Sequence, residues 1–186
     1  AQRGAGGRRL SRRVAAGRLA AMDASPSDPP ATADICDDHD AAVVVLDPVF
    51  RSLGGRHAMA GTAVTLKLFE DNSLVREAVA EDGAGKVLVV DAGGSTRRAV
   101  VGDNLAAQAA ANGWSGILVY GAVRDAAILA TIDLAVHALA TVPRKTEKRG
   151  IGDRDVPVRF AGTDIAPGDW VVADLDGVLT SPTRLA

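Results

Sequence analysis

Residues 91–133, which read DAGGSTRRAVVGDNLAAQAAANGWSGILVYGAVRDAAILATID, decide the fold of this chain. They follow an apolar run at residues 86–90, KVLVV, and contain a second run at residues 116–120, GILVY. Continuous apolar runs of this length are typical of strands buried on both faces. Between them, the alanine-rich segment LAAQAAAN predicts a helix that begins near Gly102 and ends before Gly113. Strand, helix and strand in this order predict a parallel pair with a right-handed crossover.

The rest of the globular part predicts further strands and two short helices. One helix starts at Thr32 as its cap, and another runs to Ala80 after a cap at Asp71 or Asn72. The expected strands are residues 42–46, 61–69, 134–141, 156–160 and 170–173, with a last short strand after an Asp-Gly turn. The predicted fold class is therefore α/β, a single compact domain with a central mixed β core flanked by helices.

Composition excludes several classes of function. Hydrophobic residues make up 47% of the 186 residues, which is enough for one core, but aromatic residues make up only 3%. The exposed aromatic surfaces of RNA-binding modules are therefore not expected, and a net charge of −2 gives no overall basic signal for nucleic acid. The single cysteine, Cys36, excludes an internal disulfide framework and favours a reducing, cytoplasmic location. No apolar run reaches membrane-spanning length, so no membrane partner is expected.

The N-terminal part of the chain differs from the remainder. Residues 1–22 are rich in Arg, Gly and Ala and contain no acid, and residues 23–31 form a Pro/Ser/Asp linker with little tendency to fold. The basic tail can be interpreted as a nucleic-acid arm or targeting peptide, or as a disordered or non-native extension with Met22 as the natural start. We favour the second interpretation and place the domain at residues 32–186.

The strongest candidate site is Asp103, followed after twenty residues by Arg124-Asp125. Arg124 can direct two donors onto a carboxylate or a 2-oxo acid. A second anionic oxygen can be bound by the free N–H groups at the predicted helix start, which are those of Gly102, Asp103, Asn104 and Leu105. Asp125 is a hard oxygen ligand suited to Mg²⁺ or Mn²⁺, and Asp103 can orient a water as a proton relay. The alternative is that Asp103 is only a helix cap and that Arg124 and Asp125 form a surface pair.

Other motifs give weaker signals. The residues Gly93-Gly94-Ser95-Thr96 lack the lysine and spacing of a phosphate loop, so a tight strand exit is the favoured interpretation. Asp174 and Asp176 resemble the first motif of haloacid dehalogenase phosphatases, but only ten residues follow Asp176, and we expect an Asp-Gly hairpin turn there. The basic segment RKTEKR at residues 144–149 is expected to be a solvated face or an interaction patch.

From about Thr32 to Pro182 the chain resembles the family that contains the regulator of ribonuclease E activity A and the class II 4-hydroxy-4-methyl-2-oxoglutarate aldolases. The segments that carry the resemblance are TADICD, FEDN, VLVVDAGGSTRRAVVGDNLA, YGAVRD and GIGDRDVPVRFAGTDIAPGDWVVADLDGV. The resemblance implies an RraA-like fold of the swivelling β/β/α type. Some members once carried a methyltransferase name, but this sequence has no glycine-rich methyl-donor motif.

The resemblance also implies residue roles and an activity. Arg124 would bind the 2-oxo acid, Asp125 would bind the divalent metal, largely through waters, and Asp103 would orient the water that acts as base. The backbone from Gly102 to Leu105 would bind the pyruvyl carboxylate. The implied enzyme is a divalent-metal-dependent aldolase that cleaves 4-hydroxy-4-methyl-2-oxoglutarate to pyruvate, with oxaloacetate decarboxylation as a side activity. The alternative is a non-catalytic regulator that binds and inhibits a ribonuclease E-type partner. A homotrimer, or a hexamer of stacked trimers, is implied as well.

Overall fold

The computed structural model describes residues 29–185, so most of the predicted tail and linker (residues 1–28), like Ala186, lies outside the described residues. The helices are α1 (Thr32–His39), α2 (Ser73–Val79), α3 (Asp103–Ala111) and α4 (Ala126–Leu129), with a 3-10 turn at Asp40–Ala42. The first strands are β1 (Val44–Val45), β2 (Arg51–Ser52), β3 (Met59–Lys67), β4 (Lys86–Asp91), β5 (Ala99–Val101) and β6 (Gly116–Val123). They are followed by β7 (Ala135–Thr141), β8 (Asp153–Arg154), β9 (Val158–Phe160), β10 (Thr163–Ile165), β11 (Trp170–Ala173) and β12 (Val178–Ser181).

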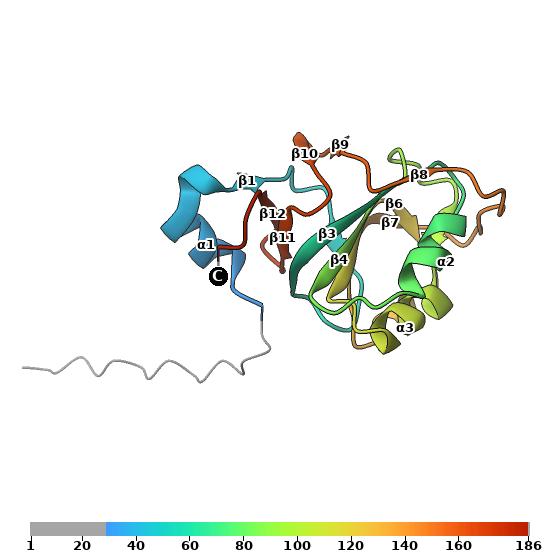
Figure 1. Ribbon diagram of the computed structural model, residues 1–186. Coiled ribbons are helices and arrows are strands. Elements are labelled where there is room, and N and C mark those ends of the chain that lie inside the picture. The colour runs from blue at the N-terminus through green and yellow to red at the C-terminus, as the bar shows by residue number, and fades with distance from the viewer. Residues whose placement is uncertain (1–28, 186) are drawn as a thin grey trace, which may run out of the picture.

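One ten-stranded mixed sheet organises the domain (Figure 1). Its order is β1-β12-β11-β3-β4-β6-β7-β2, with β5 beside β6 and β8 beside β3. The strands β3, β4, β6 and β7 are parallel, as the crossover pattern predicts, and antiparallel strands extend the sheet on both sides. The strands β9 and β10 form a separate antiparallel pair. The predicted α/β class with a central mixed β core flanked by helices is therefore confirmed.

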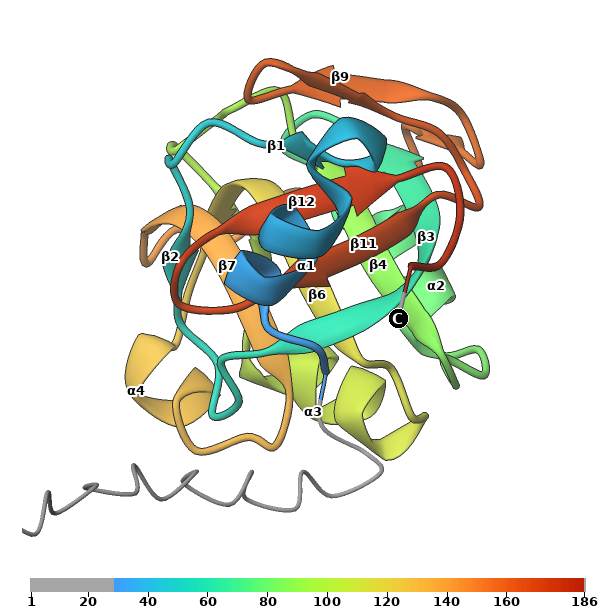
Figure 2. The same cartoon turned by 90° about the vertical axis from the view of Figure 1, so that its left-hand side faces the viewer.

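Helices cover the sheet from two sides. The helices α2 and α3 lie together on one side of the central strands, whereas α1 lies in front of β11 and β12 on the other (Figures 1 and 2). Ile35 of α1 is buried against Val172 and Leu179 of these two strands. No helix among the described residues is long and apolar enough to cross a membrane.

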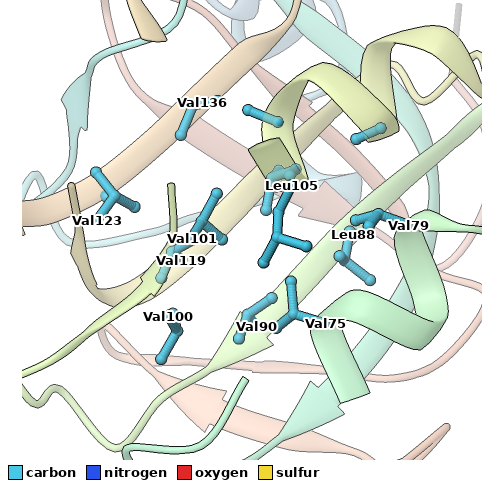
Figure 3. Close-up of a cluster of buried hydrophobic side chains, with 14 of the residues drawn as sticks. Val75, Val79, Leu88, Val90, Val100, Val101, Leu105, Val119, Val123 and Val136 are labelled. Carbon is cyan, nitrogen blue, oxygen red and sulfur yellow. The ribbon is translucent and has the colours of Figure 1, made fainter. Parts of the chain in front are cut away.

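The core beneath α2 and α3 fixes the position of α3 (Figure 3). Leu105 points from α3 into the same cluster as Val75 of α2 and Leu88 and Val119 of the sheet. Burying a side chain of this size contributes about 1.5–3 kcal/mol, against about 1 kcal/mol for a side-chain cap. Because the N-cap residue, Gly102, has no capping side chain, core packing and not the cap determines where α3 begins.

Several sequence predictions need correction. No element was predicted at residues 99–101, yet they form β5 alongside β6. Thr32 was expected to cap α1, but Ala31 is the N-cap residue, and the Thr32 hydroxyl instead donates to Asp174 Oδ1 at 2.7 Å. The strands β2, β8 and β10 were not predicted, and the expected strand at 42–46 is reduced to β1. Very short strands carry too little periodicity for recognition from sequence.

Candidate functional site

The strands β5 and β6 place the two halves of the candidate site next to each other. Val101, the last residue of β5, pairs with Val123, the last residue of β6, in parallel orientation. The Arg124 backbone N–H donates to the Val101 carbonyl at 3.0 Å. Because the carboxyl ends of parallel neighbours lie at one edge of a sheet, Gly102 and Arg124 leave that edge side by side.

The backbone at Gly102 lies directly against the side chains of Arg124 and Asp125. A β-carbon at position 102 would stand 2.8 Å from Asp125 Oδ2 and 3.1 Å from Arg124 Nε. Arg124 Nε and Asp125 Oδ2 are themselves 3.2 Å apart, and about a third of each side chain is exposed. Glycine at position 102 is thus explained by close approach, since its φ of −135° suits any residue.

Asp125 has a strained backbone. Its φ of 61° lies in the left-handed region, which residues other than glycine adopt rarely, although Asp and Asn tolerate it best. The residue follows β6 and is the N-cap of α4, where the Asp125 carbonyl accepts hydrogen bonds from the N–H groups of Ile128 and Leu129. Such strain is typical of functional sites, where the surrounding structure holds the residue in place.

A pocket of about 130 Å³ lies over the start of α3. Its lining comes from four parts of the chain: Asn72 and Arg76, Ala99 with Gly102 to Leu105, Arg124, and the loop residues Lys145, Thr146 and Lys148. The pocket therefore unites Gly102, Asp103, Asn104, Leu105 and Arg124, as the sequence predicts. Asp125 lines an adjoining hollow with Arg124, Ala126 and Thr141, so that Arg124 forms the wall between the two.

Asp103 and Asn104 differ in one respect from the prediction. Asp103 Oδ1 accepts hydrogen bonds from the Asn104 backbone N–H at 2.7 Å and from Asn104 Nδ2 at 3.2 Å. The N–H of Asn104, which was expected to be free for a ligand, is therefore already engaged. The first N–H groups of any α-helix lack intrahelical acceptors, so Gly102, Asp103 and Leu105 remain the donors to consider.

Three cations of the pocket were not predicted from the sequence. Arg76, Lys145 and Lys148 join Arg124 in the lining, where Asp103 is the only carboxylate. The segment at residues 144–149 was predicted to be a solvated face or an interaction patch, because nothing in its spacing connects it to Asp103. Four cations facing one carboxylate favour a ligand that carries more than one negative charge.

Asn72 adds a polar group to the same pocket. Its Oδ1 is buried and, among the residues that the structure describes, has no hydrogen-bond partner. A buried acceptor without a partner is costly, and such groups call for a specific explanation.

The donor set around Asp125 is sparse for a metal. Between residues 29 and 185, no group of three or more His, Cys, Asp or Glu side chains is arranged to bind a metal ion. A closed zinc-type site is therefore not present in that part of the chain. Mg²⁺ commonly keeps several waters and uses only one or two protein carboxylates, so a site based on Asp125 fits this ion with the substrate as a further ligand.

The remaining motifs have structural explanations. Gly93 and Gly94 both have φ above +60° and make a tight exit from β4, in which the Gly93 N–H donates to Asp91 Oδ1. Asp174 holds the β11–β12 turn through hydrogen bonds from the N–H groups of Asp176 and Gly177, which confirms the hairpin interpretation. Burial raises the pKa of Asp174, but these bonds and those from Thr32 lower it below its usual value.

Known proteins resemble this chain over nearly all of its described part. The family model RraA-like, described as Aldolase/RraA, matches residues 32–180. A protein of Azotobacter vinelandii named "Putative 4-hydroxy-4-methyl-2-oxoglutarate aldolase" is 54% identical over 83% of this chain and 95% of its own length. A relative of the same name from Pseudomonas putida is 56% identical over 83% of this chain and 94% of its own length.

Solved structures show the same architecture. The RNA-processing inhibitor RraA from Thermus thermophilis superposes with a TM-score of 0.82 at 44% identity, covering 85% of this chain and 96% of that one. The Streptomyces coelicolor protein RraAS2, described as an unusual member of the RNase ES inhibitor family, gives a TM-score of 0.67 at 30% identity, covering 83% and 81%. Relatives named as enzymes and relatives named as inhibitors therefore share this fold.

Proposed function

The chain belongs to the RraA-like family, and from this membership and the pocket over α3 we propose that it is a divalent-metal-dependent aldolase. The proposed substrate is 4-hydroxy-4-methyl-2-oxoglutarate, which is cleaved to pyruvate. The observation that carries the proposal is the convergence of the α3 N-terminus, Arg124 and Asp125. Gly102 lies against both side chains, and it shares one pocket with Arg124 and Asp103.

Different residues of the pocket bind the two carboxylates of the substrate. Arg124 and the N–H groups at the start of α3 bind the carboxylate of the pyruvyl half, since a guanidinium forks onto a carboxylate and a helix N-terminus attracts anions. The helix dipole contributes only about 0.3–1 kcal/mol at an exposed site, so Arg124 is the main anchor. The second carboxylate of the substrate faces the other cations of the pocket, Arg76, Lys145 and Lys148.

Cleavage breaks the bond between C3 and C4 of the substrate. Asp103 holds a water that removes the proton from the C4 hydroxyl, and C4 becomes the carbonyl carbon of one pyruvate. The electron pair of the broken bond moves through C3 into the 2-oxo group of the other half, and C3 then takes up a proton to give the second pyruvate. Arg124 keeps the pyruvyl half in place while this charge develops.

Asp125 is the residue proposed to hold the metal ion, with waters and the substrate as further ligands. When bound, Mg²⁺ or Mn²⁺ would supply Lewis-acid stabilisation of the negative charge on the 2-oxo oxygen. Oxaloacetate places a carboxylate where the first substrate carries its C4 group, so its loss as CO₂ sends the electron pair to the same position. Oxaloacetate decarboxylation is therefore proposed as a side activity.

A steady-state assay of pyruvate release tests the proposal. The protein is supplied with 4-hydroxy-4-methyl-2-oxoglutarate or oxaloacetate, in Mg²⁺ and separately in EDTA. Metal-dependent release from both substrates is expected. If neither substrate yields pyruvate faster than in protein-free controls with the same Mg²⁺, the proposed activity is wrong.

A second candidate function is inhibition of a ribonuclease E-type partner without catalysis. It is favoured by the Thermus thermophilis relative, which is named as an RNA-processing inhibitor and is 44% identical. Capture of a ribonuclease from lysate, together with slower RNA cleavage when the purified chain is added, would support this function. Pyruvate release without any effect on RNA cleavage would support the aldolase instead.

The resemblance to the family further supports a homotrimer, or a hexamer of two trimers, as the proposed assembly. Analytical ultracentrifugation separates these states by mass. A trimeric or hexameric species is expected, and a monomer at micromolar concentration would contradict the assembly without affecting the residue roles described above.

A further inference from the structure

Asp71 is a buried carboxylate that lies next to the pocket residue Asn72. Its side chain is completely buried, yet it does not line the pocket. Oδ1 accepts a hydrogen bond from the Ser73 N–H at 2.8 Å, and Oδ2 accepts from the N–H groups of Arg149 at 2.6 Å and Ile151 at 3.3 Å. A buried carboxylate with several N–H donors is well stabilised in its ionised form.

The turn around Gly150 wraps the start of α2. The Gly150 N–H donates to Ser73 Oγ at 3.1 Å, so three successive N–H groups, those of Arg149, Gly150 and Ile151, are directed at Asp71 and Ser73. Gly150 has a φ of +71°, which allows the chain to curve in this way. Successive N–H groups in such a turn form a concave anion site, and here the anion is the Asp71 carboxylate.

The other end of the same loop is anchored to β5. The Ala99 N–H donates to the Arg144 carbonyl at 2.8 Å, and Arg98 Nη1 donates to the Lys145 carbonyl at 2.9 Å. The loop is therefore held at residues 144–145 by Arg98 and by Ala99 of β5, and at residues 149–151 by Asp71 and Ser73. Lys145 belongs to the first anchor, and Lys148 directly precedes the second. Both lysines line the pocket.

Asp71 also connects this loop to the opposite wall. Its neighbour in the chain, Asn72, lines the pocket, and so does Arg76 one turn further along α2. A single buried carboxylate thus joins the wall that carries Arg76 to the loop that carries Lys148.

We propose that Asp71 is a positioning residue that fixes the 144–151 loop, so that Lys145 and Lys148 face the pocket and select substrates with a second carboxylate. The selection part of this inference rests on the proposed function, whereas the fixing of the loop does not. The side chain of Asp71 acts through the loop and touches no substrate atom.

The variant Asp71→Asn tests the proposal with little change in volume. An Asn side chain can keep the acceptor for Ser73, but its amide group presents donors to the N–H groups of Arg149 and Ile151. The matched control is Asp164→Asn, which removes one carboxylate from an exposed pair with Arg159. Ser73→Ala, which removes the hydroxyl that bonds to Gly150 and to Asp71 but keeps the Asp71 carboxylate, is a milder second variant in case Asp71→Asn does not fold.

The first readout is hydrogen exchange, which needs no activity. Amide exchange at residues 149–151 is expected to accelerate by about tenfold or more in Asp71→Asn, and less in Ser73→Ala, with no change in Asp164→Asn. Unchanged exchange at residues 149–151 in a folded Asp71→Asn, or in Ser73→Ala if the first variant fails to fold, would overturn the proposal whether or not the wild type is an aldolase.

The second readout is selectivity. In Asp71→Asn, KM for oxaloacetate is expected to rise by about tenfold, while the inhibition constant of pyruvate, which has no second carboxylate, changes by less than about twofold. A merely structural role would weaken both ligands alike, and that result would overturn the selection role. Absence of turnover in the wild type would refute the proposed function instead, and the exchange data would still decide the role of Asp71 in fixing the loop.

Discussion

The backbone of Gly102 lies so close to the side chain of Asp125 that a β-carbon at position 102 would stand 2.8 Å from Oδ2. Two segments more than twenty residues apart in the sequence therefore meet at contact distance. The pairing of β5 with β6 produces this meeting, since Gly102 follows one strand and Arg124 follows the other. The proposed chemistry depends on this contact, because it places the start of α3 and the Arg124 guanidinium at one pocket and the Asp125 carboxylate in the hollow that adjoins it.

Gly102→Ala should lower the activity of the site without unfolding the protein. The atoms that a new methyl group would meet are Asp125 Oδ2 and Arg124 Nε and Cγ, all of them side-chain atoms, so these side chains can shift without disturbing the backbone. Pyruvate release should fall by about 100-fold, as expected for displacement of catalytic groups by about 1 Å. The melting temperature should stay within about 3 °C of the wild type.

Gly177→Ala is the matched control for this substitution, since a β-carbon there would meet no atom within 4 Å. It should leave both turnover and melting temperature near the wild-type values. Wild-type turnover in a folded Gly102→Ala would show that the contact between Gly102 and Asp125 has no role in catalysis.

Asp125→Asn should remove the proposed metal ligand and keep the backbone conformation. Asn tolerates the left-handed region as well as Asp does, so the φ of 61° should persist. Loss of the charged oxygen should lower turnover at fixed Mg²⁺ by about 100-fold and raise the Mg²⁺ concentration needed for half activity.

Asp155→Asn makes the same chemical change at an exposed residue with a similar φ of 55°, and it should have no effect on turnover. Equal Mg²⁺ dependence of Asp125→Asn and wild type would remove Asp125 from the metal site.

Arg124→Lys should weaken binding of the 2-oxo acid. Lysine keeps the positive charge but loses the fork of two donors that matches a carboxylate. KM for oxaloacetate should rise by about tenfold, and inhibition by pyruvate should weaken to a similar extent. Arg159→Lys, at an exposed ion pair with Asp164, is the control. If Arg124→Lys instead leaves both constants unchanged, the guanidinium does not bind the substrate.

Protonation of Asp71 should contribute to unfolding of the protein in acid. Burial raises the pKa of this carboxyl, but the hydrogen bonds from Ser73, Arg149 and Ile151 outweigh burial and lower the pKa from 3.8 to about 2. A lowered pKa in the folded state means that the stabilisation is complete above pH 3.8 and disappears as the pH falls toward 2. Chemical unfolding followed from pH 5 to pH 2 should show this loss in the wild type. A folded Asp71→Asn should lose less stability over that interval, and an equal loss in both proteins would contradict the assignment.

The position of the main site residues could be predicted from sequence for a physical reason. Apolar strands and an alanine-rich helix give strong periodic signals, and the carboxyl ends of parallel strands meet at one edge. This places Gly102, Asp103, Arg124 and Asp125 near one another before any coordinates are known. The strand β5 was missed because three apolar residues carry no usable period, although β5 aligns Gly102 with Arg124.

The cationic wall could not be predicted in the same way. Lys145 and Lys148 line the pocket on a loop that is held by distant contacts, among them Ala99 with Arg144 and Asp71 with Arg149. These contacts join residues 45 and 78 positions apart, and each depends on where whole elements pack. Local sequence patterns do not show such long-range contacts. A basic segment that lines a pocket therefore cannot be distinguished, from its sequence alone, from one that is exposed on the surface.

The most direct test of a metal-dependent lyase is pyruvate release from 4-hydroxy-4-methyl-2-oxoglutarate by the wild type and by Asp125→Ala, each measured in Mg²⁺, in EDTA, and in EDTA followed by excess Mg²⁺. The wild type is expected to convert both halves of the substrate to pyruvate in Mg²⁺, to stop in EDTA and to recover with excess metal, whereas Asp125→Ala is expected to be inactive throughout. Near-wild-type release by Asp125→Ala, or release by the wild type that EDTA does not reduce, would contradict it.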